Sequence, residues 1–176
     1  MKRSIIFSSI FAASVVFTSC EKWLDVGDPK NAVETSVIFQ DEAGLQAAIA
    51  GMYNSGNETP IGMLSLYTGL QSDDLGANVT GYDPYKNNSL LSNETTVGDI
   101  WSSFYTGIYR ANDIIDGVPK SNTLSDVIKN QAVGEALFLR GMYYFYMVNL
   151  YGDVPLIIGT DLKTNELAPR NASAEI

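Results

Sequence analysis

The fold is decided by residues 134–156, GEALFLRGMYYFYMVNLYGDVPL. In the range 136–148, eleven of thirteen residues are apolar, and only Arg140 and Gly141 interrupt the run. A helix that is apolar on every side is buried among other elements. The run is too short and too rich in tyrosine for a membrane span, which needs about 20 apolar residues. We therefore predict a long core helix that runs to the turn at Gly152.

A second long helix precedes this one along the chain. Capping-box spacings mark the starts of the two helices, at Thr96–Asp99 and Thr123–Asp126, and Gly117 with Pro119 closes the first. Two antiparallel helices of about 20 residues form a hairpin of the kind that stacks into solenoids. We predict an all-α fold whose core contains the aromatic residues Trp101, Phe104, Tyr105, Tyr143, Tyr144 and Tyr146.

Two shorter predicted helices and a long loop lie upstream. Apolar residues at helical spacing predict a helix over 41–53, and 63–70 fits a shorter one. Residues 73–93 are dense in Asp, Asn, Gly and Ser, which is typical of a loop. A loop of this length inside a compact domain usually has a function.

Four residues of this loop are the candidate ligand contacts: Tyr82, Tyr85, Asn87 and Asn88. Tyrosine rings can stack on the apolar faces of sugar rings, and amide side chains can hydrogen-bond the sugar hydroxyls. Binding groups are commonly carried by loops on a rigid scaffold. The alternative is an ordinary loop that contacts no ligand.

Residues 1–19 have the features of a lipoprotein signal peptide. Lys2 and Arg3 form a basic start, and an apolar stretch follows over 5–17. The only cysteine, Cys20, comes next after two small polar residues, where a bacterial lipobox places the acylated thiol. Several acyl chains anchor a protein firmly, because each buried CH₂ contributes about 0.8 kcal/mol. The alternative is a plain secretory signal whose cleavage site lies beside a cysteine.

The chain therefore divides into a signal peptide (1–19), a lipidated leash and lead-in (20–40) and a helical domain (41–176). The helices of this domain are too few to cover the apolar long helix, and residues 172–176 look like the start of another helix. We expect the domain to be incomplete and to continue beyond residue 176. The alternative is a natural C-terminus with a frayed end.

Composition excludes several classes of function. A net charge of −9 argues against a nucleic-acid partner, whose phosphates call for Lys and Arg. The absence of His excludes His-based acid–base catalysis and His-ligated metals, and we expect neither a metal nor a cofactor. Asp73 and Asp74 are sequence neighbours whose side chains point apart, whereas glycoside hydrolysis needs two carboxyls facing each other across a cleft.

Arg140 is the one charged residue within the apolar run. A buried guanidinium needs a partner. We predict a structural ion pair with Asp113, Asp116 or Asp153, and the alternative is a contact with a ligand.

Several pieces of the chain resemble the SusD/RagB family of nutrient-binding outer-membrane lipoproteins of Bacteroidetes. Residues 134–156 resemble the family's long-helix signature, and 19–26 resemble its lipidated start. Residues 37–43 with 50–54 are similar to its first helix, and 168–170 to the segment before its next helix. The pieces occur in family order over essentially all of residues 20–176.

The resemblance implies a SusD-like fold of tetratricopeptide-like helical hairpins, of which this chain is the N-terminal region. It implies an outer-membrane lipoprotein, exposed on the cell surface and anchored through Cys20. Such a protein captures oligosaccharides or other nutrients and delivers them to a SusC-type TonB-dependent transporter, without being an enzyme. Two alternatives remain: a structural helical-repeat adaptor that binds only a protein partner, and a surface glycoside hydrolase.

Overall fold

The computed structural model describes residues 35–55, 62–76, 78 and 80–176. The predicted signal peptide, Cys20 and most of the predicted leash lie outside these residues. Within the described part of the chain, no helix has both the length and the apolar character needed to cross a bilayer. In chain order the elements are α2 (Thr35–Ile38), α3 (Glu42–Ser55), α5 (Leu64–Gln71), α6 (Asp83–Lys86), α7 (Thr95–Gly117), η2 (Val118–Lys120), α8 (Asp126–Tyr151), β1 (Val154–Pro155), α9 (Leu162–Asn165), β2 (Arg170–Asn171) and η3 (Ser173–Glu175).

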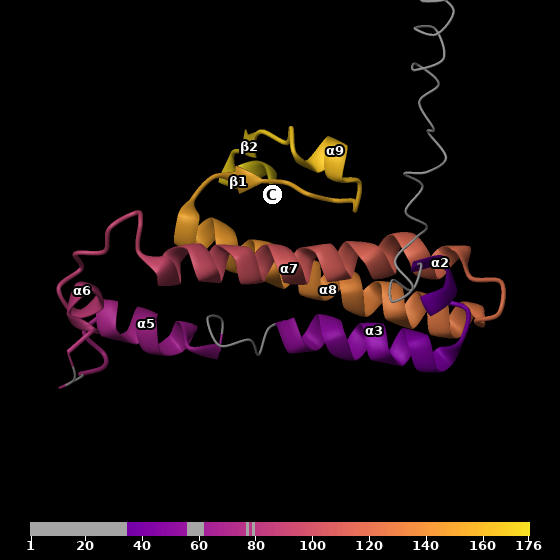
Figure 1. Ribbon diagram of the computed structural model, residues 1–176, viewed down its shortest axis with the longest axis horizontal. Coiled ribbons are helices and arrows are strands. Elements are labelled where there is room, and N and C mark those ends of the chain that lie inside the picture. The colour runs from indigo at the N-terminus through magenta and orange to yellow at the C-terminus, as the bar shows by residue number, and fades with distance from the viewer. Residues whose placement is uncertain (1–34, 56–61, 77, 79) are drawn as a thin grey trace, which may run out of the picture. The chain divides into compact units, whose positions relative to one another are not determined.

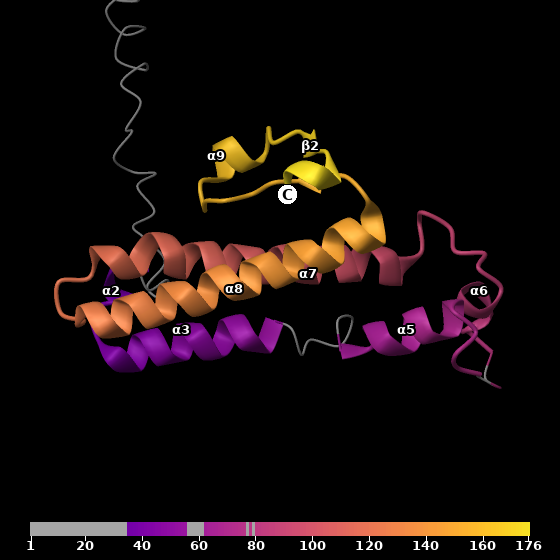
Figure 2. The same cartoon turned by 180° about the vertical axis from the view of Figure 1, so that it is seen from behind.

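The prediction of an all-α fold is confirmed. Helices α7 and α8 form an antiparallel hairpin, and α3 and α5 follow one another along one side of it (Figure 1). The segment after α8 turns back along the other side, as both views show (Figure 2). Its strands β1 and β2 are two residues long and pair antiparallel, with Val154 opposite Asn171.

A close approach of α7 and α8 fixes the hairpin. A Cβ on Gly107 of α7 would lie 2.6 Å from the ring of Tyr143 on α8, so only glycine leaves room for that ring. The Tyr143 hydroxyl donates a hydrogen bond to the Met52 carbonyl oxygen of α3 at 3.0 Å. Tyr143 and Met52 are both almost completely buried. One tyrosine therefore joins the three main helices of the core.

A charged side chain also joins α7 to α3. Arg110 donates hydrogen bonds to the Gly51 carbonyl oxygen at 3.0 Å and to the Ser55 hydroxyl at 2.6 Å. These acceptors lie in the last turn of α3, where free carbonyls carry partial negative charge that a guanidinium stabilises. No local sequence pattern predicts this role of Arg110, because its partner lies 59 residues away.

Both predicted capping boxes are wrong in their residues. Helix α7 begins at Thr95 after Glu94, which makes no side-chain cap. The cap of α8 is Ser125, whose hydroxyl accepts a hydrogen bond from the Ile128 backbone N–H. The Thr123 hydroxyl instead donates to the Gln40 carbonyl oxygen and ties the α7–α8 turn to the turn between α2 and α3. At Thr123, a tertiary contact therefore takes the place of the predicted cap.

Most of the aromatic residues predicted for the core lie there. Phe104, Tyr143 and Tyr144 are buried, and Trp101 and Tyr105 are partly buried against the same cluster. The exception is Tyr146, which is 41% exposed. Successive residues of a helix are turned by about 100°, so a long apolar run necessarily points some rings away from the hairpin. The helices of the described domain therefore cover α8 only in part, as expected from their small number.

Candidate functional site

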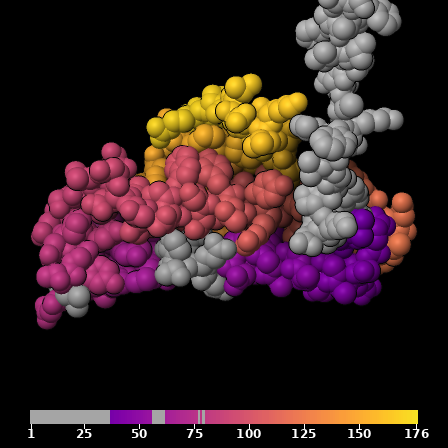
Figure 3. All heavy atoms as spheres, in the orientation of Figure 1, coloured from indigo at the N-terminus to yellow at the C-terminus, as the bar shows by residue number. Residues whose placement is uncertain are grey.

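The predicted loop over 73–93 is partly helical and makes up one end of the described domain (Figure 3). It contains the single turn of α6, whose first residues include Pro84, a residue suited to a helix start. Figure 1 shows α6 beside the end of α5. The four candidate ligand contacts all lie on or next to this turn.

Tyr85 is the buried support of α6. Its ring is 7% exposed and stacks on Tyr67 of α5, with ring centroids 4.7 Å apart and planes inclined by 20°. The stack fixes α6 against α5. This burial leaves little of Tyr85 for a ligand, so the structure gives it a supporting role.

Tyr82 and Asn87 are the outward members of the set. Tyr82 is half-buried, and its ring centroid lies 6.5 Å from that of Tyr85 at a tilt of 57°. Asn87 follows the last residue of α6, and its side chain is exposed. A ring and an amide are thus presented to solvent by the same short turn.

Asn88 holds the turn in place. Its backbone has φ +49°, a left-handed conformation that asparagine tolerates better than most residues. Its side-chain amide donates to the Gln71 carbonyl oxygen at 3.1 Å, which joins the end of α6 to the end of α5. We call Tyr82, Asn87 and Asn88 the α6 surface.

The neighbouring carboxylates have turn contacts. Asp74 accepts a hydrogen bond from the Ser72 hydroxyl at 2.9 Å, and Asp73 has φ +63° in the turn after α5. Both side chains are exposed. Among the described residues, no three side chains of His, Cys, Asp or Glu come together as metal ligands, here or elsewhere.

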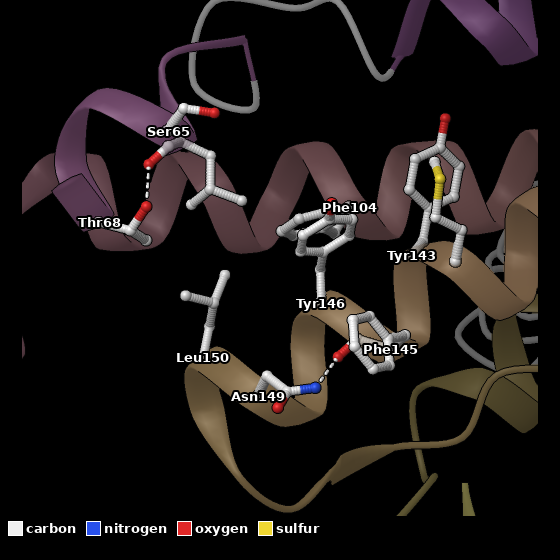
Figure 4. A pocket seen from close by; sticks show the side chains of 10 residues that line it. Ser65, Thr68, Phe104, Tyr143, Phe145, Tyr146, Asn149 and Leu150 are labelled. Carbon is white, nitrogen blue, oxygen red and sulfur yellow. Dashed lines mark hydrogen bonds between the residues drawn. The ribbon is translucent and has the colours of Figure 1, made fainter.

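Apart from the α6 surface, the structure has a hollow of about 450 Å³ between α5, α7 and α8 (Figure 4). Phe104 and Tyr146 stack in its wall with centroids 6.1 Å apart. Two of its polar side chains donate within their own helices: the Asn149 amide to the Phe145 carbonyl oxygen and the Thr68 hydroxyl to that of Leu64. Much of the remaining lining is apolar and includes Phe104, Met142 and Leu150.

The predicted ion pair of Arg140 is corrected by the structure. Among the described residues, the partner of Arg140 is the side-chain oxygen of Asn112, at 2.7 Å, and not a carboxylate of Asp113, Asp116 or Asp153. Asn112 faces α8. Asp113 and Asp116, which follow it on α7, are turned to another side of the helix and line a separate polar hollow. The Asn112 side-chain nitrogen in turn donates to the Ile157 carbonyl oxygen at 3.0 Å and to that of Gly159 at 3.4 Å.

Asn112 belongs to a set of side chains that hold residues 154–159, which we call the strap. The Tyr105 hydroxyl donates to the Pro155 carbonyl oxygen at 2.7 Å. The Tyr144 hydroxyl accepts from the Ile157 N–H at 2.6 Å. Burial raises the pKa of both phenols, so they remain neutral. The role of Arg140 is therefore structural: it orients the amide that binds the strap.

The role of Asn112 in this network was not predicted from the sequence, although a signal for it existed. It lies four residues after Ile108, on the apolar face of α7, and it is fully buried. A polar residue on a buried face needs partners. Such a position indicates a buried hydrogen-bond network but does not identify the partners.

Comparison with known proteins places this geometry in a family. A family model described as "Starch-binding associating with outer membrane" matches residues 22–175. A SusD-like protein of Formosa agariphila is 28% identical over 149 residues, which cover 78% of this chain and 28% of that protein. A SusD-like protein of Bacteroides ovatus is 28% identical, with 95% of this chain and 31% of that protein covered.

Two solved structures from Bacteroides fragilis share the fold. A SusD-like protein has a TM-score of 0.63 at 21% identity, with 82% of this chain and 28% of the other covered. A SusD-like carbohydrate-binding protein has a TM-score of 0.61 at 18% identity, with 79% and 29% covered. The chain thus spans about three-tenths of the length of these proteins. From the match to the family model over most of its length, the chain belongs to the SusD-like family.

Proposed function

We propose that the protein is a cell-surface, lipid-anchored binding protein that captures glycans and delivers them to a SusC-type TonB-dependent outer-membrane transporter. The family's description names starch binding and the outer membrane. One structural neighbour is described as carbohydrate-binding. The proposal concerns the whole protein, of which this chain supplies the N-terminal helices.

The α6 surface is the proposed point of glycan contact. The observation that carries the proposal is that Tyr82 is partly exposed on the turn of α6. The stack of Tyr85 on Tyr67 holds this turn against α5. Because that stack and the Asn88 hydrogen bond hold the turn, binding a sugar there costs little ordering of the chain. The ring supplies an apolar stacking face, and the Asn87 amide supplies a donor and an acceptor for hydroxyls.

The anchor and the partner belong to the same proposal. Acylation of Cys20 fixes the protein to the outer membrane, where the transporter lies. In this arrangement the protein binds and releases the glycan without breaking a bond. We expect no catalytic residue, cofactor or metal in this chain.

Calorimetry of the full-length protein against a panel of polysaccharides, with starch first, tests the proposal. We expect saturable binding of at least one glycan, and Tyr82→Ala to weaken it by about tenfold, the effect of one lost aromatic contact. Tyr109→Ala is the matched control, because this 51% exposed tyrosine lies on α7 away from α6. Absence of binding to every glycan contradicts capture, and equal binding by the Tyr82 variant contradicts the location.

The two alternative functions make different predictions. An adaptor that binds only protein co-purifies with the transporter whether or not a glycan is present, and binds no glycan in calorimetry. A hydrolase releases reducing sugar, and the release disappears in Asp73→Asn or Asp74→Asn. We expect glycan binding without release of reducing sugar.

A further inference from the structure

The end of the domain that carries the α6 surface is acidic. Residues 62–99 contain five carboxylates and one ammonium group, which leaves them a net charge of −4. The acidic residues are Asp73, Asp74, Asp83, Glu94 and Asp99, and the only Lys or Arg is Lys86. Figure 1 shows that the end of α5, the turn of α6 and the start of α7 lie at the same end of the described domain. A ligand that approaches α6 therefore meets mainly negative charge, because Asp and Glu are ionised at neutral pH.

The one ammonium group of this end is offset within α6 itself. Lys86 lies one helical turn after Tyr82, because its backbone N–H donates to the Tyr82 carbonyl oxygen at 3.1 Å. The Lys86 Nζ is 3.9 Å from a carboxylate oxygen of Asp83, and the two side chains are 36% and 59% exposed. The α6 turn is thus neutral as a whole, and the negative charge of the region comes from the segments around it.

Two of the carboxylates lie beside the α6 surface. Asp73 and Asp74 follow Gln71, whose carbonyl oxygen accepts the hydrogen bond of the Asn88 amide. The Ser72 hydroxyl donates to Asp74 at 2.9 Å and holds that carboxylate in the turn. Both acidic side chains are exposed, so their charges act on the solvent next to Asn88.

A third carboxylate acts on the ring stack that supports α6. Asp99 is the fifth residue of α7 and is exposed. The pKa of Tyr67 is raised from 10.0, chiefly by burial and in smaller part by neighbouring groups that include Asp99. Because Tyr67 stacks on Tyr85, the negative field of Asp99 reaches the support of the turn.

A glycan that carries carboxylate or sulfate groups needs cations to bind it. Proteins hold such groups with Lys or Arg, and most specifically through the paired N–H donors of a guanidinium. The arginines of the described residues make contacts within the domain instead: Arg110 with α3, Arg140 with Asn112, and Arg170 with the Asp153 carbonyl oxygen at 2.8 Å. The α6 surface itself offers a phenol ring and two amides, which suit uncharged hydroxyls.

We propose that the α6 surface selects neutral glycans and excludes glycans that carry carboxylate or sulfate groups. This inference rests on the proposed function and names the class of glycan that the site takes. The surrounding carboxylates bind no ligand in this arrangement. They repel an anionic glycan, which also finds no guanidinium at α6 to offset the loss of water from its charges. A neutral glycan makes the same stacking and amide contacts without this cost.

Three forms of one polysaccharide test the selection by calorimetry with the full-length protein: soluble starch, hydroxyethyl starch and carboxymethyl starch. At an equal degree of substitution, the two derivatives carry substituents of similar size and differ mainly in charge. At about 20 mM salt we expect the hydroxyethyl form to bind at least about tenfold more tightly than the carboxymethyl form. At about 1 M salt, where the Debye length is about 3 Å, we expect the difference to shrink to less than about threefold. If another neutral glycan binds in place of starch, its two derivatives are used in the same way.

A double variant locates the effect at the α6 surface. Asp73→Asn with Asp74→Asn removes two charges, keeps an acceptor oxygen for Ser72, and places asparagine at the left-handed position 73, where it is tolerated. We expect carboxymethyl starch to bind at least about threefold more tightly, and hydroxyethyl starch to bind as before. Glu42→Gln with Asp126→Asn is the matched control, because it removes two exposed charges where α3 and α8 begin, at the end opposite α6 (Figure 1).

The outcomes separate this inference from the proposed function. Equal affinity for the hydroxyethyl and carboxymethyl forms, or tighter binding of the carboxymethyl form, overturns the inference and leaves glycan capture standing. A preference for the neutral form that the Asp73 and Asp74 double variant does not reduce overturns the assignment to the α6 surface. Failure of every neutral glycan to bind contradicts the proposed function and the inference with it.

Discussion

The ring of Tyr143 occupies the space that a side chain at Gly107 would need, since a Cβ there would lie 2.6 Å from the ring. The same tyrosine donates a hydrogen bond to the Met52 carbonyl oxygen. The ring cannot move aside without losing this bond. The packing of α3, α7 and α8 therefore depends on the absence of one methyl group.

Gly107→Ala is the first prediction that follows from this contact. The added methyl group overpacks the α7–α8 seam, and we expect the free energy of unfolding to fall by about 1–3 kcal/mol. Urea denaturation followed by circular dichroism measures it. Gly98→Ala, in an open part of the same helix, is the control and is expected to be neutral or stabilising. Equal effects at the two glycines would show that the contact with Tyr143 is unimportant.

Arg140→Met removes the donor to the buried Asn112 oxygen and keeps the length of the side chain. We expect a loss of about 1–3 kcal/mol, the cost of leaving a buried acceptor without its partner. Since Asn112 is neutral, the loss is expected to be the same at about pH 7 and about pH 3. An ion pair with an aspartate would instead weaken as the carboxylate gains a proton. Lys163→Met, at an exposed site, is the control.

Tyr151→Phe tests a pH-dependent contribution to stability. The Tyr151 hydroxyl donates to the Val97 carbonyl oxygen at 2.8 Å, and burial raises its pKa from 10.0 to about 12. The folded state thus favours the neutral phenol. Its contribution is fully present below pH 10 and is lost as the pH rises through about 12.

The expected outcome is a difference in the free energy of unfolding between wild type and Tyr151→Phe that shrinks over that alkaline range. At neutral pH we expect the variant to lose about 1 kcal/mol, the value of one hydrogen bond. Tyr109→Phe, at an exposed site, should show neither effect. A difference that stays constant up to pH 12 would assign the raised pKa no role in stability.

Cys20→Ser tests the anchor. The thiol is the only one in the chain, so its replacement should abolish incorporation of radiolabelled palmitate and release the protein from the membrane fraction. Lys22→Ser, two residues further on, is the control and should keep both label and location. Retained label in the Cys20 variant would contradict the lipoprotein assignment.

Helix positions were predictable because they depend on local periodicity. The predicted helix over 41–53 is α3 (Glu42–Ser55), and that over 63–70 is α5 (Leu64–Gln71). The long run ends at Gly152, which has φ +71° and whose N–H donates to the Val148 carbonyl oxygen. Apolar residues recurring every three or four positions, and glycine at the stop, are sufficient for these assignments.

The sequence indicated which segment holds the candidate site. It did not indicate which of its residues face solvent and which support the turn. The composition of residues 73–93, dense in Asp, Asn, Gly and Ser, indicated the candidate segment. Which of Tyr82 and Tyr85 faces solvent depends on Tyr67, which lies 18 positions before Tyr85 in the sequence and stacks on its ring. No local sequence pattern identifies a stacking partner that lies so far away along the chain.

The helical hairpin and the family could be inferred from short-range spacing and contiguous motifs. The pairing of Arg140 with an amide rather than a carboxylate, and the outward position of Phe138 and Phe145, could be seen only in the folded protein. These outcomes depend on how helices distant in sequence rotate and pack against one another. That rotation is set by contacts such as Gly107 with Tyr143, which form only when the chain has folded.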